Sequence, residues 1–138
     1  MSKAARFALL IILLHATVVA LHAAAHRVLK VEASRAQSLF IGIVIVIAPL
    51  LAGMLILKSK RAAGAVIFTF SMAGSLIFGL YNHFVLISPD HDLHLAGEPG
   101  SAWVTMFQLT AVLLALTEGL GVVAGILMLK KGYAPVLL

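Results

Sequence analysis

Four long apolar runs constrain this chain more than any other feature of its sequence. A membrane-spanning helix needs about 20 mainly apolar residues, and the runs of this length cover residues 5–26, 38–58, 62–87 and 102–129. Backbone groups in hydrocarbon must be paired within their own segment, so such runs fold as helices. Pro49 is expected to kink the second helix without breaking it. The sequence therefore predicts an all-α, polytopic membrane protein, a single domain over residues 1–138 built as a bundle of four transmembrane helices.

The composition and the charges exclude several classes of protein. With 62% hydrophobic and only 11% charged residues, the chain is unlike an ordinary soluble domain. A net charge of +5 would suit nucleic acid, but the cations lie at the ends of the apolar runs and form no basic face. The absence of cysteine excludes disulfides and thiolate metal sites. We therefore expect the lipid bilayer as partner and no nucleic acid, with a homo-oligomer or a larger membrane complex as further alternatives.

The distribution of lysine and arginine predicts how the helices are oriented. Seven cations share one side of the predicted membrane with no acidic residue among them: Lys3, Arg6, Lys58, Lys60, Arg61, Lys130 and Lys131. The other side carries three cations and four carboxylates: Arg27, Lys30, Arg35, Glu32, Asp90, Asp92 and Glu98. Positive charge is retained inside, so both termini are predicted to be cytoplasmic and residues 27–37 and 88–100 to face outward. The expected location is the cell or plasma membrane.

The N-terminus also allows a second interpretation. Its basic start, its apolar core over residues 7–21 and the alanines at 23–25 have the features of a cleavable signal peptide. Cleavage would leave His26 as the first residue, with a free amine beside its imidazole that could chelate copper. A discarded signal, however, has no use for His15 and His22, which weaken its apolar core. We favour retention of this segment as the first helix.

Three histidines share one face of the first predicted helix. At about 100° per residue, His15, His22 and His26 fall within roughly a 40° arc. Imidazoles are costly in hydrocarbon, and ionisable groups within membrane helices commonly belong to functional sites. We therefore expect this face to carry the chemistry of the protein.

Helix geometry places two of these histidines level with residues of other helices. At a rise of about 1.5 Å per residue, His26, His83 and Gln108 each lie about 31 Å from the cytoplasmic ends of their helices. His22 lies about one turn deeper. These residues are predicted to gather at the outer end of the bundle.

The outward loop adds two more histidines. Ser88 and Pro89 suit the N-cap and first position of a short helix, in which His91 and His94 would point the same way. The predicted metal ligands are therefore His22, His26, His83, His91 and His94 with Asp90, and the supporting polar residues are Asn82, Gln108 and Asp92.

Imidazole and carboxylate ligands without thiolate suit Zn²⁺, Cu²⁺ or non-haem iron and do not select one of them. The structural alternative is that the loop histidines are solvated and the helix-end histidines bond to backbone. Alignment on one face and a shared depth raise the metal interpretation to the same weight as this alternative.

A second pair of ionisable residues is predicted near the middle of the membrane. His15 lies about 15 Å and Glu118 about 16 Å from the cytoplasmic boundary. A carboxylate in lipid is costly unless it is protonated or has a partner. The pair could relay protons or bind a cation, or Glu118 could simply lock two helices together as a neutral, hydrogen-bonded group.

Four functions remain open from the sequence, and whether the protein is an enzyme is open with them. The first is metal handling or a small redox role at the outer histidine cluster. The second is electron transfer through a b-type haem held by His83 and either His22 or His26. The third is a proton- or cation-coupled transporter using His15 and Glu118, and the fourth is a non-catalytic accessory subunit of a membrane complex.

Overall fold

The computed structural model describes residues 1–95 and 101–132, and this part of the chain is helical without strands. Its elements are α1 (Lys3–Leu29), α2 (Arg35–Phe40), the π-helix η1 (Ile41–Ile47), α3 (Ala48–Leu57), α4 (Arg61–Leu80), the π-helix η2 (Tyr81–Val85) and α5 (Ala102–Gly132). Because α2, η1 and α3 follow without a break, as do α4 and η2, the chain has four helices long and apolar enough to cross a membrane. The prediction of an all-α chain with four such helices is confirmed.

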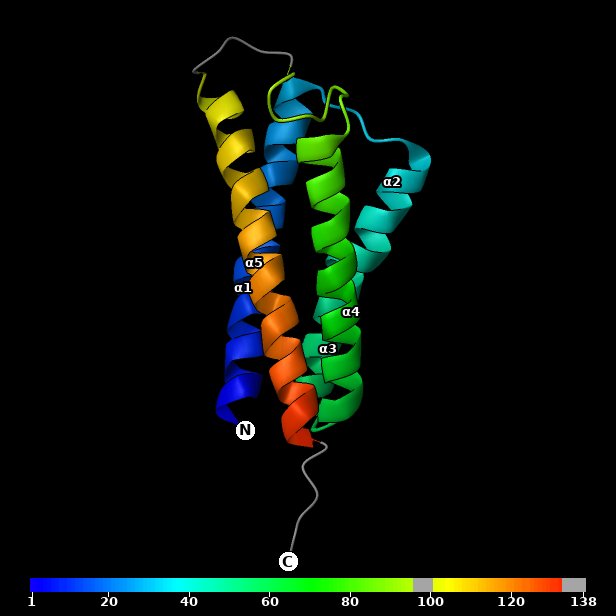
Figure 1. The fold of residues 1–138 in the computed structure, drawn as a ribbon, viewed down its shortest axis with the longest axis vertical. Helices are drawn as coiled ribbons and strands as arrows, with labels where there is room; N and C mark the ends of the chain where they lie inside the picture. Colours follow the sequence, from blue (N-terminus) through cyan, green and yellow to red (C-terminus); the bar gives the residue numbers. More distant parts are fainter. Residues whose placement is uncertain (96–100, 133–138) are drawn as a thin grey trace, which may run out of the picture.

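The four helices run alternately up and down, so α1 begins and α5 ends at the same end of the bundle (Figure 1). We call this the terminal end, and the opposite end, where the segment after η2 lies, the histidine end. The helix α5 packs along both α1 and α4, and α3 packs against α4. At the histidine end, α2 diverges from the other helices (Figure 1).

The second helix begins earlier than predicted because the chain supplies a capping box. The Ser34 hydroxyl accepts a hydrogen bond from the Gln37 backbone N–H (3.3 Å), and the Gln37 side chain accepts one from the Ser34 backbone N–H (2.8 Å). This Ser-x-x-Gln pattern satisfies two backbone groups that a helix start leaves unpaired. The helix therefore starts at Arg35.

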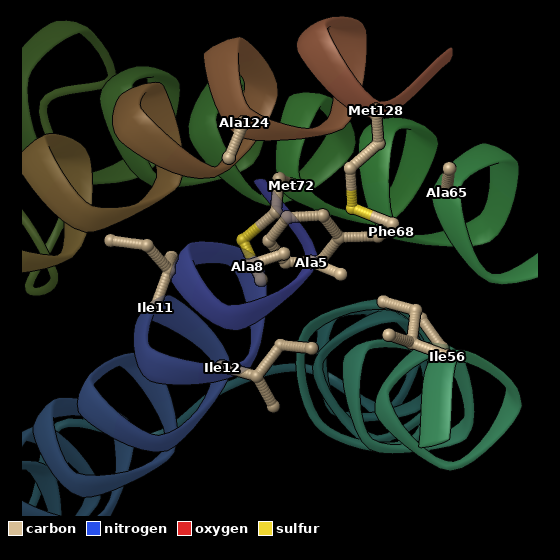
Figure 2. Packing of buried hydrophobic residues seen from close by; sticks show 11 residues of the cluster. Ala5, Ala8, Ile11, Ile12, Ile56, Ala65, Phe68, Met72, Ala124 and Met128 are labelled. Atoms are coloured by element: carbon tan, nitrogen blue, oxygen red, sulfur yellow. The ribbon is translucent and has the colours of Figure 1, made fainter. Parts of the chain in front are cut away.

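Apolar side chains close the terminal end of the bundle (Figure 2). The cluster brings together all four long helices: Ala5, Ala8, Ile11, Ile12, Ala52, Ile56, Ala65, Phe68, Met72, Ala124 and Met128. Phe68 and Met72 are fully buried among small alanines, which let the helices approach closely. The terminal end is therefore a packed apolar core.

The outer surface of the bundle is strongly apolar. Large side chains such as Leu13, Phe70 and Ile77 are about 70% exposed, at 67%, 73% and 69%. Buried polar residues, by contrast, line the interior: His15, His22, Ser71, Ser75, Asn82, His83, Thr110, Thr117 and Glu118. An apolar exterior around a partly polar interior is the distribution expected of helices surrounded by lipid.

Pro49 does not break the second helix. The helix widens before it, and the Ala48 N–H bonds to the carbonyl of Ile43 five residues back. Proline has no N–H to donate, and the carbonyl of Ile45, four residues before Pro49, accepts a hydrogen bond from a side chain of α1. The donor is the His15 imidazole, through Nε2 at 3.2 Å.

Two glycines bring α4 and α5 together. A Cβ at Gly121 would lie 2.6 Å from Met72 Cγ, and one at Gly125 would collide with the side chain of Thr69 and come within 3.1 Å of its Cα. The G-x-x-x-G spacing predicts such a close seam. In the structure this seam lies between two helices of the same chain, α4 and α5.

Candidate metal centre

Three histidines meet at the histidine end of the bundle. His22 and His26 lie one turn apart on α1, and His83 comes from η2. One ring nitrogen from each lies within 4.8 Å of the others. The His22 ring centroid is 4.8 Å from that of His26 and 4.8 Å from that of His83, and Phe107 of α5 packs against all three. A helical i, i+4 pair and one residue of a facing helix thus form a compact cluster.

The protein fixes the proton of His22 on one nitrogen. The Thr110 hydroxyl donates to the carbonyl of Met106 (2.6 Å), so its oxygen is an acceptor toward His22 Nδ1, 2.8 Å away. Nδ1 must therefore carry the hydrogen, and neutral His22 keeps its lone pair on Nε2. Nε2 is buried and has no hydrogen-bond partner among the described residues.

The other two rings are held in the same way. The Nδ1–H of His26 donates to the carbonyl of Val31 (3.2 Å), and the Nδ1–H of His83 donates to the carbonyl of Asp90 (3.1 Å). Carbonyls only accept hydrogen bonds, so both neutral rings also keep their lone pairs on Nε2. Metal-binding histidines are typically oriented by such a hydrogen bond from the second ring nitrogen.

A carboxylate completes the cluster. Asp90 Oδ1 lies 3.1 Å from His26 Nε2 and 3.3 Å from His83 Nδ1. It is buried, yet no hydrogen bond of acceptable geometry reaches it within the described residues. Burial alone would raise the pKa of Asp90, but the adjacent His26 and His83 imidazoles outweigh it and hold the pKa below its ordinary value. A carboxylate oxygen facing an imidazole lone pair calls for a cation between them, either a proton or a metal ion.

The segment after η2 brings Asp90 back over the cluster. The helix ends where Leu86 becomes extended, and the Ser88 hydroxyl accepts a hydrogen bond from the Asp90 N–H (3.2 Å). The Asp92 N–H then donates to the carbonyl of His83 (2.9 Å). These local bonds make a tight return that presents the Asp90 side chain to α1.

The short helix predicted at Ser88 is wrong for the residues that the structure describes. Residues 88–95 form successive turns, with the His91 N–H on the carbonyl of Ser88 and the His94 N–H on that of His91. The two imidazoles still meet, with their Nδ1 atoms 3.1 Å apart. They form a pair separate from the three-histidine group. Glu98 lies outside the described residues.

The supporting polar residues tie neighbouring elements together. The Gln37 side chain donates to Asn82 Oδ1 (3.0 Å), which links α2 to η2, and Gln108 donates to the carbonyl of Asp92 (3.2 Å). Burial raises the pKa of Asp92, against a smaller opposite effect of His83 and His91. Sequence reasoning missed Gln37 and Thr110, because a single polar residue in or beside an apolar run does not reveal its partner.

The deeper pair is also brought together. His15 Nδ1 lies 3.9 Å from Glu118 Oε1, and both side chains are almost fully buried. Because His15 Nε2–H donates to Ile45, the lone pair of a neutral His15 lies on Nδ1 and faces Glu118. Glu118 Oε2 has no partner in the part of the chain that the structure describes.

The cluster fits a small metal ion better than a haem. Metal–nitrogen bonds of about 2.0–2.1 Å place tetrahedral ligand atoms about 3.4 Å apart. The ring nitrogens lie within 4.8 Å of one another, so they need to approach by at most about 1.4 Å. A haem would have to enter between His83 and a ring of α1, but His22 and His83 are in contact at 4.8 Å and Phe107 covers both. The packing gives the haem alternative no support.

Comparison with known proteins gives no relative from which function could be transferred. No family model, curated protein or solved structure matches the chain. The site must therefore be interpreted from its own geometry.

Proposed function

We propose that this chain is an integral membrane protein that binds one transition-metal ion through His22, His26 and His83, with Asp90 as a fourth ligand or a hydrogen-bonding partner. One observation carries the proposal. Three imidazoles lie together, with one ring nitrogen of each within 4.8 Å of the others, and each has Nδ1 hydrogen-bonded to a protein acceptor, so Nε2 is the nitrogen available as a ligand. Both termini are proposed to be cytoplasmic, with the site at the outer face of the cell membrane.

The ligand set defines the chemistry that this site supports. Three imidazoles and a carboxylate suit Zn²⁺, Cu²⁺ or non-haem iron. Copper or iron would support metal handling or a small redox step, and zinc would support metal handling. As partners we propose the bilayer itself and a homo-oligomer or larger complex, in which the chain acts as the metal-binding subunit.

The direct test is elemental analysis of the purified, detergent-solubilised protein by inductively coupled plasma mass spectrometry. We expect near-stoichiometric copper, zinc or iron in the wild type. The double variant His22→Ala/His26→Ala should lose it, because only His83 and Asp90 would remain. If iron is found, an absorption spectrum is recorded, and a Soret band in it would support the haem alternative.

A matched control uses the two histidines of the segment after η2, which lie outside the cluster. The variant His91→Ala/His94→Ala removes the same number of imidazoles and should keep its metal. Circular dichroism should give the same helical spectrum for both double variants. Equal metal content in wild type and His22→Ala/His26→Ala would contradict the proposal, and loss in the control would move the site to the loop.

A second candidate function rests on the deep pair, for which the observation is the 3.9 Å approach of two buried ionisable groups. In a proton- or cation-coupled transporter, the proton or cation would reach Glu118 from the histidine end and leave toward the terminal end. The apolar cluster around Phe68 and Met72 closes that second route in this conformation, so transport would require the helices to part. In proteoliposomes, transport that Glu118→Gln leaves unchanged at every pH would exclude this candidate.

A further inference from the structure

A cavity of about 320 Å³ connects the histidine cluster with the middle of the bundle. Its walls come from α1, η1, α4 and α5, and it contacts His22, His26, His83 and Asp90 at one end and Ser75 and Glu118 at the other. From His83 to Ser75 is eight residues of helix, or about 12 Å. Between the two ends the lining is apolar, with Val19, Ile41, Ile45 and Leu114.

The cavity is reached from the side of the bundle. Its lining includes Ala23 and Arg27 of α1 and Ala33 just before α2, and all three residues are exposed. At this end of the bundle α2 diverges from the other helices (Figure 1). A molecule would therefore enter between α1 and α2, near the outer boundary of the predicted membrane and without crossing the bundle.

The deep end of the cavity has two buried polar groups without partners in the described parts of the chain. Ser75 is fully buried and Glu118 is 2% exposed, yet Ser75 Oγ and Glu118 Oε2 make no hydrogen bond. The hydroxyls of Ser71, Thr110 and Thr117 all donate back to carbonyls of their own helices. An unpaired group in such a place costs free energy, so a hydrogen-bonding group that entered the cavity would stabilise both atoms.

Gly79 opens the space in front of Glu118. A Cβ at this position would meet only Glu118 Oε2, at 3.7 Å. The Glu118 carboxyl group therefore lies against bare backbone of α4, one turn from Ser75. A larger residue at position 79 would project into the cavity.

We propose that this cavity binds a neutral, lipid-dissolved molecule made of an apolar body and a hydroxyl group, the chemistry of an alkylphenol. The hydroxyl group donates to Glu118 Oε2 and accepts from the Ser75 hydroxyl, which matches one donor and one acceptor to the two unpaired groups. The apolar body lies along Ile41, Ile45 and Leu114. A charged head group is disfavoured because the lining offers it no compensating charge except at the ends.

The probe for this proposal is para-hexylphenol, with its methyl ether as the partner that cannot donate. Binding is measured by ultrafiltration of the radiolabelled compound with purified protein in detergent, against empty micelles at the same detergent concentration. We expect saturable binding of the phenol. The methyl ether should bind about tenfold more weakly, because it leaves Glu118 Oε2 unpaired.

Two glycine variants test the location. Gly79→Leu fills the cavity and should abolish saturable binding. Gly119→Leu adds the same side chain on α5, where a Cβ meets nothing within 4 Å, and should bind like the wild type. Ser75→Ala removes only a hydroxyl group, so it should fold normally. It should weaken the phenol and the methyl ether by the same several-fold factor, because both ligand oxygens accept from the Ser75 hydroxyl.

The proposal does not depend on the metal. Metal content, measured on the same samples, should be equal in wild type, Gly79→Leu and Ser75→Ala, so the two proposals can fail separately. Absence of saturable phenol binding, equal binding of the phenol and its ether, or unchanged binding in Gly79→Leu would each overturn the cavity proposal.

Discussion

At the scale of single residues, Thr110 decides how His22 can act. Its hydroxyl hydrogen is committed to the carbonyls of Met106 and Phe107, so the side chain can only accept from the imidazole. This places the hydrogen on Nδ1, so that the lone pair of neutral His22 lies on the buried Nε2. Thr110 is thus a positioning residue for the metal centre.

We expect Thr110→Val to weaken metal binding by about 10- to 100-fold, the range found when partners of metal-ligating histidines are removed. Valine keeps the shape but removes the acceptor, so the His22 ring is free to turn. Affinity is measured by competition with a chromophoric chelator, and Thr110→Ser should restore it because serine returns the hydroxyl group.

The matched control for this prediction is Thr117→Val. Thr117 is also buried on α5 and also donates to carbonyls of its own helix. It makes no hydrogen bond to a histidine within residues 1–95 and 101–132. Unchanged affinity in Thr110→Val, or equal loss in both variants, would show that the hydrogen bond does not orient His22.

At the scale of helices, both wide π-helical segments adjoin ionisable sites. In η1, the carbonyl of Ile45 receives the His15 hydrogen bond, and η2 carries His83 and Asn82. Single wide turns often occur at functional positions because they shift side chains and free backbone carbonyls. Here η1 supplies a backbone carbonyl to His15, and η2 carries two of the buried polar side chains.

The seam between α4 and α5 yields a stability prediction. Gly125→Ala places a Cβ against the side chain and Cα of Thr69, so the helices must separate. We expect a loss of about 1–3 kcal/mol in the free energy of unfolding, the usual cost of overpacking. Unfolding is followed by circular dichroism during titration with sodium dodecyl sulfate.

Gly119→Ala is the control for the helix seam, because nothing lies within 4 Å of a Cβ at that position. It should be neutral or slightly stabilising, since alanine has the higher helix propensity. If Gly119→Ala and Gly125→Ala unfold at the same concentration of sodium dodecyl sulfate, the close approach at Gly125 contributes nothing to stability.

At the scale of the whole molecule, the two ends of the bundle differ in kind. The terminal end is a packed apolar cluster, while the histidine end holds buried imidazoles, a carboxylate and a cavity. The excess of lysine and arginine at the terminal end predicts that this end lies in the cytoplasm.

Because the chain has no cysteine, its orientation can be tested with single introduced thiols. A membrane-impermeant maleimide should label Leu93→Cys, whose native leucine is 80% exposed, in intact cells. Ser2→Cys should react only after lysis. The reverse pattern would invert the topology, and an intact mass lacking residues 1–25 would instead support the signal-peptide alternative, which removes both His15 and His22.

Local patterns in the sequence were sufficient for several features of this protein. Run length against bilayer thickness predicts the four helices, and the 3.6-residue period aligns His15, His22 and His26. Helical rise also places Glu118 level with His15, and the structure brings them to 3.9 Å. The helices, the shared face and the shared depth follow from the length and rise of each helix, which its own residues determine.

The tertiary structure alone decided which groups meet. It joined His83 rather than His91 and His94 to the α1 histidines, and it supplied Thr110 as the partner of His22. It also formed the cavity, whose lining combines residues of α1, η1, α4 and α5. Such contacts depend on the rotation and crossing of helices far apart in sequence, and many faces of an apolar helix are nearly equivalent until packing selects one.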